Sequence, residues 1–148
     1  MDPNSSGTGT IAGSMLTVTG AGTLVIDANQ AGNGNYSAAI RARGGVVVNK
    51  AAQTIDFTPP ATPVTYSPGL TIALSATGGA SGNPVVFTVD RFSSGTGTIA
   101  GNTLTVTGAG TLVIDAHQAG NGNYSAATRV QATVVVHKAA QTIGFTPQ

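Results

Sequence analysis

Residues 101–117, GNTLTVTGAGTLVIDAH, decide the fold, because two alternating runs flank a glycine-rich turn. In the first run every second residue is apolar, at Leu104 and Val106. In the second run the apolar positions are Leu112, Ile114 and Ala116. Apolar residues with a period of two predict strands that bury one face. The intervening Gly-Ala-Gly supplies the backbone freedom that a tight turn needs.

The same pattern recurs through the rest of the chain. Leu70–Ala76 and Val85–Val89 alternate in the same way, and a last strand is predicted at about Arg129–His137. Gly- and Asn-rich turns separate these runs at 78–84 and 120–123. No segment predicts a helix. About six to eight short strands in one repeat predict an all-β fold, an immunoglobulin-like antiparallel β-sandwich.

Composition agrees with this fold and excludes several functions. Apolar residues make up 41% of the chain, but charged residues only 7%, against roughly a quarter in an average domain. A net charge of +1 without a Lys/Arg cluster predicts no binding to nucleic acid. The apolar runs are too short for membrane insertion. Because cysteine is absent, disulfides and thiolate metal sites are excluded.

A tandem duplication organises the chain. Ser5–Pro59 and Ser93–Pro147 are related by a constant offset of 88 and agree at 45 of 55 positions. The differing positions of the first copy are 14, 15, 29, 40, 42, 43, 44, 45, 49 and 56. The proline-marked joint after Lys50 sets the phase. We predict a vector-derived tail (1–4), the C-terminal part of a preceding repeat (5–51), a complete repeat (52–139) and the start of the next (140–148).

Three motifs carry a resemblance to a known family. LSATGGASGNPV (Leu74–Val85), TGAGT (Thr107–Thr111) and QAGNGNYSAA (Gln118–Ala127) resemble the bacterial Ig-like repeats of very long exported proteins. The resemblance implies sandwiches strung in arrays at the cell surface or outside the cell, as a stalk, spacer or adhesin. Neighbouring repeats are then the partners of each unit. The resemblance implies no catalytic residues and no cofactor.

A hydrolase is the enzymatic alternative. Asp115 and His117 lie two residues apart on one predicted strand, so they share a face, and Ser125 follows. A serine hydrolase needs contact between nucleophile and base. The counterpart of His117 in the first copy is Asn29, and Ser125 lies in an ordinary turn. We therefore favour solvent-facing polar residues and predict that the chain is not an enzyme.

Oxygen ligands for a metal are a second possibility. The candidates in the second copy are Asp115, Gln118, Asn121 and Asn123. Those in the first copy are Asp27, Asn29, Gln30, Asn33 and Asn35. Calcium prefers six to eight oxygens with several carboxylates, and one Asp per site is too little charge. We expect an Asn-Gly turn and no metal.

A carbohydrate- or surface-ligand-binding module is the alternative among binding proteins. Its candidate ligand-binding residues are Asn121, Asn123 and Tyr124, with the loop around Gly78–Pro84. Tyr124 and its copy Tyr36 either stack on a sugar or anchor the turn. With no Trp and 5% aromatic residues, the second interpretation is favoured.

The leading segment holds only the later strands of a sandwich. Ser5–Lys50 has no counterpart of Ile55–Val89, so it should expose an apolar face and an open edge. One hypothesis is a homo-oligomer formed by strand exchange, with Gln141–Pro147 as one possible donor. The other is that Ser5–Lys50 stays disordered beside one folded, monomeric domain.

Overall fold

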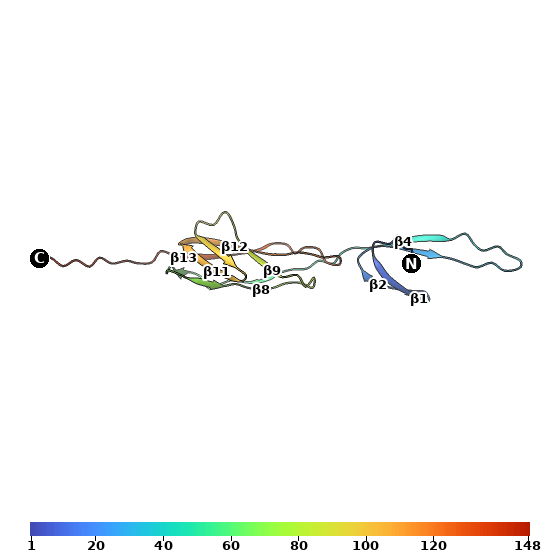
Figure 1. Cartoon of the computed structure of the whole chain (residues 1–148), viewed down its shortest axis with the longest axis horizontal. Coiled ribbons are helices and arrows are strands. Elements are labelled where there is room, and N and C mark those ends of the chain that lie inside the picture. Colours follow the sequence, from blue (N-terminus) through green and yellow to red (C-terminus); the bar gives the residue numbers. More distant parts are fainter. The chain divides into compact units, whose positions relative to one another are not determined.

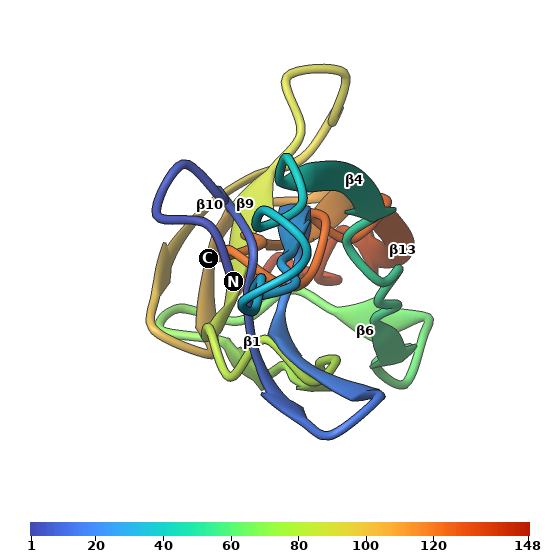
Figure 2. The same ribbon diagram turned by 90° about the vertical axis from the view of Figure 1, so that its right-hand side faces the viewer.

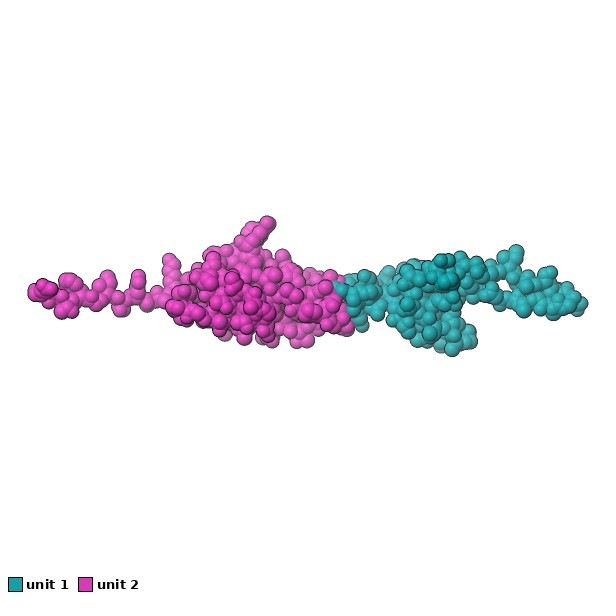
Figure 3. All heavy atoms as spheres, viewed as in Figure 1, with its two compact units in different colours: residues 1–52, 120–125 teal, residues 53–119, 126–148 magenta.

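The computed structural model describes residues 1–148 and consists of strands and turns (Figure 1 and Figure 2). No helix of a length and apolarity that would cross a membrane is present. The chain divides into two compact units (Figure 3): unit 1 comprises residues 1–52 and 120–125, and unit 2 residues 53–119 and 126–148. This division falls one residue after the expected boundary between Ala51 and Ala52. It also groups the turn 120–125 with unit 1.

Unit 2 is a β-sandwich, as the sequence predicts. Its nine strands are β5 (Asp56–Thr58), β6 (Val64–Thr65), β7 (Thr71–Ala73), β8 (Ser75–Thr77), β9 (Val85–Val89), β10 (Thr96–Ala100), β11 (Thr103–Gly108), β12 (Gly110–Gln118) and β13 (Val130–His137). One layer is the sheet β6-β13-β12-β9, and the other contains β10-β11-β7 and β5-β8 (Figure 1). Between them Leu104, Leu112, Ile114 and Val134 are fully buried. The alternation in residues 101–117 thus builds the facing strands of the two layers.

Two segments of unit 2 each form two short strands, and the two strands of a segment pair with different partner strands. The Leu70–Ala76 run buries Leu74 as predicted, but it forms β7, which pairs with β11, and β8, which pairs with β5. At the division the N–H of Leu74 is donated to the carbonyl of Asn102 at 2.8 Å. The preceding segment divides likewise, because β5 pairs antiparallel with β8 and β6 pairs parallel with β13. These divisions raise the strand number above the predicted six to eight.

The turn between β11 and β12 depends on a glycine. Gly110 has a φ of 137°, a conformation that side chains rarely adopt. A Cβ added there would lie 2.5 Å from the backbone nitrogen of Gly95 and 2.8 Å from its Cα. Gly22 repeats this arrangement against Gly7 in unit 1. Only glycine allows the two backbones to approach so closely.

Unit 1 contains two hairpins whose strands pair in the same registers as their copies in unit 2. Its strands are β1 (Thr8–Ala12), β2 (Met15–Gly20), β3 (Gly22–Ala28) and β4 (Ala42–Val48). Leu24 faces Val46 as Leu112 faces Val134. Because unit 1 has no counterpart of β5–β9, Val46 is 41% exposed where Val134 is 0% exposed. The predicted apolar face of the leading segment is therefore exposed.

Strand β4 departs most from its copy. Four of the ten differing positions are consecutive, so that Ala42–Gly45 reads Ala-Arg-Gly-Gly where Val130–Thr133 reads Val-Gln-Ala-Thr. Gly44 has no side chain where Ala132 is buried in the core of unit 2. Glycine is unfavourable within strands, and β-branched residues are favourable. The β4 sequence is consequently the weaker strand former.

Candidate functional site

The turn at Asn121–Tyr124 is held by the side chain of its first residue. We call this turn, and its copy at Asn33–Tyr36, a tip turn. The Oδ1 atom of Asn121 accepts the N–H groups of Asn123 (2.9 Å) and Tyr124 (3.0 Å). The N–H of Asn121 is donated to the carbonyl of Tyr124 at 2.9 Å. This is the local hydrogen bonding for which asparagine is favoured in turns.

The first copy forms the same turn at Asn33–Tyr36. The Oδ1 atom of Asn33 accepts the N–H groups of Asn35 (2.8 Å) and Tyr36 (2.9 Å). The N–H of Asn33 is donated to the carbonyl of Tyr36 at 2.8 Å. Since the two turns share sequence and hydrogen bonding, their shape is set locally.

Within unit 1, the second-copy turn binds backbone groups. The N–H of Ala51 is donated to the carbonyl of Asn123 (2.8 Å), and the N–H of Ser125 to the carbonyl of Ala51 (2.9 Å). Ala51 and Tyr124 form an isolated parallel bridge. The Oδ1 atom of Asn123 also accepts the N–H of Ala21 at 2.9 Å. The candidate ligand-binding residues Asn121, Asn123 and Tyr124 thus lie together in a turn that already binds the chain itself.

Two buried glutamines hold the Gly78–Asn83 loop of unit 2. The Oε1 atom of Gln118 accepts the N–H of Gly79 (2.8 Å), and its Nε2 donates to the carbonyl of Asn83 (2.9 Å). Gln53 donates from Nε2 to the carbonyl of Ala119 at 2.9 Å. Gln118, considered above as a metal ligand, instead satisfies backbone groups. Gln118 continues the period of two set by Ile114 and Ala116, and this pattern predicts that its side chain is buried.

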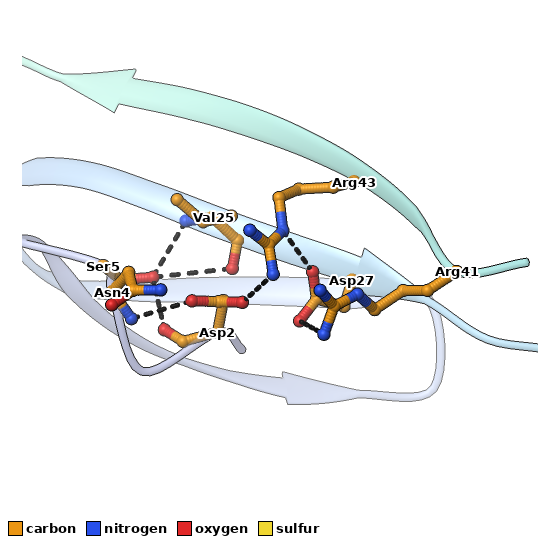
Figure 4. Close-up of polar contacts among 7 residues, drawn as sticks. All are labelled: Asp2, Asn4, Ser5, Val25, Asp27, Arg41 and Arg43. Carbon is orange, nitrogen blue, oxygen red and sulfur yellow. Dashed lines mark hydrogen bonds and ion pairs between the residues drawn. The ribbon is translucent and has the colours of Figure 1, made fainter.

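A carboxylate–guanidinium cluster lies on unit 1 (Figure 4). Arg43 contacts a carboxylate oxygen of Asp2 through Nη2, and its Nε lies 2.9 Å from Oδ1 of Asp27. Arg41 approaches Asp27 at 3.8 Å. The N–H of Asp2 is donated to the carbonyl of Val25 at 2.8 Å. Asp2, which lies within the predicted vector-derived tail 1–4, is buried and part of this unit.

The corresponding cluster of unit 2 contains Asp90, Asp115, Arg129 and Gln131. Gln131 donates from Nε2 to Oδ1 of Asp115 at 2.7 Å and approaches Oδ2 of Asp90 at 3.4 Å. The Nη1 atom of Arg129 lies 3.7 Å from Asp115 and 4.0 Å from Asp90. Since the N–H of Asp90 is donated to the carbonyl of Val113 at 2.8 Å, Asp90 corresponds to Asp2 in position and bonding.

A surface depression of about 750 Å³ adjoins this second cluster. Its lining includes Asp90, Asp115 and Arg129, together with the exposed ring of Phe92. The guanidinium carbon of Arg91 lies 4.9 Å from the centre of that ring. In the first copy Pro3 and Asn4 occupy the positions of Arg91 and Phe92. Charged groups beside an aromatic ring are therefore specific to unit 2.

Acid should weaken unit 2 through Asp90. The pKa of Asp90 is lowered, chiefly because the Phe92 N–H is donated to its Oδ1 atom at 2.8 Å. Hydrogen bonding with Asp115 and the charge of Arg129 lower it further, against desolvation. A folded-state pKa below the unfolded one means that this stabilisation is complete above about pH 5 and is lost as the pH falls through the folded pKa. We expect the thermal midpoint to fall less on acidification in Asp90→Asn than in the wild type.

Circular dichroism melts between about pH 7 and pH 3 measure this difference. Asp56→Asn is the control, because the Asp56 side chain is exposed on β5. Identical acid profiles for Asp90→Asn and the wild type would contradict the role of Asp90.

The residues considered for hydrolysis have separate partners. Asp115 accepts from Gln131 within unit 2. His117 is exposed, and its Nε2 lies 3.4 Å from Oγ1 of Thr88. Ser125 belongs to unit 1 and donates its N–H to Ala51. Asp115, His117 and Ser125 thus bond to Gln131, Thr88 and Ala51 and form no Ser-His-Asp triad.

Comparison of the chain with known protein families, with characterised proteins and with solved structures finds no match. The sandwich architecture therefore stands on the strand pairing. The resemblance to bacterial Ig-like repeats stands on its three motifs alone.

Proposed function

We propose that the chain is a structural or adhesive Ig-like repeat module of a bacterial exported or cell-surface protein, serving as a spacer in a stalk. Three features support this role: the tandem duplication, the sandwich and a charge-poor surface of neutral polar residues. The course of the chain through unit 2 supports it most directly.

The chain enters and leaves unit 2 at opposite ends of the longest strand, β12. At the entry, Gln53 donates to the carbonyl of Ala119, the residue after the last one of β12. At the exit, Val136 of β13 pairs with Gly110, the first residue of β12. Tension applied through neighbouring repeats would therefore run along the sandwich, which is what a linear array needs.

The exit strand is also tied to the entry segment. Strand β6 pairs with β13 in parallel, with Val64 opposite Val136. The N–H of Tyr66 is donated to the carbonyl of His137 (2.8 Å), and the N–H of Val135 to Oγ1 of Thr62 (2.8 Å). Pulling the ends apart would slide these segments past each other. Their hydrogen bonds then resist together instead of opening one at a time.

Force spectroscopy tests the spacer role. The chain has no cysteine, so cysteine handles at Ala52 and Ala139 are unique attachment points. We expect a single cooperative unfolding step of unit 2. Thr62→Val should lower the unfolding force, because it removes the acceptor of the Val135 N–H, at a cost of about 1 kcal/mol in stability.

Thr107→Val is the matched control. It removes a 3.0 Å hydrogen bond to Thr96 on the β10–β11 hairpin, away from the loaded strands. An equal loss of unfolding force in both variants, or gradual unfolding of the wild type, would argue against a load-bearing module.

A ligand-binding module is the second candidate, favoured by the depression beside Phe92. An exposed aromatic ring next to carboxylates and Arg129 matches the chemistry of a polar, ring-containing ligand such as a sugar. A glycan array tests this candidate. Binding lost in Phe92→Ala would support it. Binding lost in Tyr124→Ala would place the site at the tip turn instead, and an array without hits would leave the spacer role.

A further inference from the structure

We propose that residues 139–147 of one molecule dock on unit 1 of a second molecule, where they supply the first strand that unit 1 lacks. The occupant is a second copy of this chain. The corresponding contact, between Ala51 and the turn Asn121–Tyr124, occurs once within the chain. The chain also contains a second copy of each side of it: Ala139 with the tail that follows, and the turn Asn33–Tyr36. The association goes beyond the spacer role and does not depend on it.

The donor is the C-terminal tail, which extends from the sandwich (Figure 1). Ile143 and Phe145 are 93% and 83% exposed. Their copies at the entry to unit 2, Ile55 and Phe57, are each 7% exposed and belong to its core. The tail therefore carries two apolar side chains that the repeat buries elsewhere.

The acceptor is the apolar face of unit 1. In unit 2, Ile55 and Phe57 share one core cluster with Val106 and Val134. The copies of these valines in unit 1, Val18 and Val46, are each 41% exposed. They occupy the same registers in their hairpins. Because β5 contacts β13 in unit 2, the copy of β13 in unit 1, β4, presents part of the surface that this strand contacts in the complete repeat. The pairing partner of β5, β8, has no counterpart in unit 1, so the docked strand packs on this face without a sheet partner.

The backbone contacts of Ala51 give the register of docking. Ala139 is the copy of Ala51, and the turn Asn33–Tyr36 is the copy of Asn121–Tyr124. In the docked state the N–H of Ala139 is donated to the carbonyl of Asn35, and its carbonyl accepts the N–H of Ser37. Every residue in these contacts has the same type as in the contacts within the chain.

A glutamine continues this register. Gln53 donates to the carbonyl of Ala119 at 2.9 Å, and the copies of these residues are Gln141 and Ala31. Gln141 of the tail therefore binds Ala31 of the acceptor, between the turn and the apolar face. Because the acceptor turn already has its bound shape, docking does not require it to be ordered.

The geometry is head-to-tail, because donor and acceptor are different surfaces of the same chain. Each docked molecule leaves one free tail and one free unit 1. Such heterologous contacts form open chains of molecules instead of closed dimers. The association is concentration-dependent and weak, since each contact is a single short strand.

Site-specific disulfide trapping between molecules tests the proposal. The chain has no cysteine, so Ala139→Cys and Tyr36→Cys are prepared separately, mixed and oxidised mildly. Bridge partners on paired strands bring their Cα atoms within reach of a disulfide. We expect the 139–36 heterodimer to accumulate faster under native conditions than under denaturing conditions.

Tyr124→Cys is the matched control for Tyr36→Cys. It occupies the same repeat position, but its bridge partner Ala51 is already in place within the chain. Ala139→Cys should therefore not trap Tyr124→Cys above the denatured level. Equal trapping of both tyrosine positions, or trapping of neither, would overturn the proposal. Exchange of whole hairpins would join Ala51 to Tyr36 and would also leave the 139–36 pair untrapped.

Sedimentation velocity over a range of concentrations gives a second readout. The wild-type weight-average mass should rise beyond that of a dimer. Ile143→Ser combined with Phe145→Ser should keep it near the monomer value. Gly144→Asp is the control, because it restores the first copy's residue at a position that is exposed on β5, and it should associate like the wild type. A monomeric wild type, or association unchanged in the double variant, would refute the docking.

Discussion

Gly110→Ala is expected to destabilise unit 2 by about 3 kcal/mol or more. A side chain at φ 137° is strained in any surroundings, and its Cβ would lie 2.5 Å from the backbone nitrogen of Gly95. The obstacle is backbone, so no side chain can rotate away. Relief requires the β11–β12 turn to separate from the segment before β10. Urea denaturation followed by circular dichroism measures the loss.

Two glycine variants are controls for this effect. Gly122→Ala places a Cβ where no atom lies within 4 Å, so a change below about 1 kcal/mol is expected. Gly22→Ala creates the same clash in unit 1 and should leave the main unfolding transition of unit 2 in place. If Gly110→Ala proves as mild as Gly122→Ala, the close approach of the two backbones is not what fixes the turn.

Leu104→Ala should cost about 3 kcal/mol, since Leu104 is fully buried between the two layers. Truncation removes its transfer free energy and leaves a cavity that neighbouring side chains fill only in part. The same denaturation experiment gives the value. At dilute concentrations the loss should appear in the cooperative transition of unit 2.

Leu16→Ala is the matched variant, because Leu16 is the copy of Leu104 on β2 but is only partly buried. We expect its effect on the same transition to stay below about 0.5 kcal/mol. Equal effects of the two truncations would mean that the hairpins of unit 1 contribute to this transition as much as the core of unit 2 does, contrary to the exposure of Val18 and Val46.

The sandwich was predictable because its signal is local. Alternation within residues 101–117 and Val85–Val89 predicts which side chains are buried, and the structure confirms this at Leu112 and Phe87. The division of the Leu70–Ala76 run was not predictable in the same way. Alternation predicts the inward face of a strand, but the choice of pairing partner depends on distant residues. The run keeps its alternation of apolar and polar residues while its pairing partner changes from β11 to β5.

The polar residues show the same limit. The tip turns follow from Asn121 and Asn33, whose side chains bond to backbone within three residues. The Asp90–Asp115–Arg129 cluster joins residues far apart in the chain, and no short motif indicates it. Asp2 had a usable signal, because it lies 88 positions before Asp90. With residues 1–4 predicted as a vector-derived tail, Asp2 lies outside the duplicated range Ser5–Pro59.

The glycines of β4 have a consequence for the fidelity of folding. When the denatured chain refolds, the segment that becomes β5–β9 meets two hairpin pairs of almost the same sequence and must select one. Each glycine lowers strand preference by up to about 1 kcal/mol, so Gly44 and Gly45 together disfavour packing on unit 1 by up to roughly thirtyfold. The substitutions that distinguish the two copies thus favour packing of this segment on β10–β13 over packing on β1–β4.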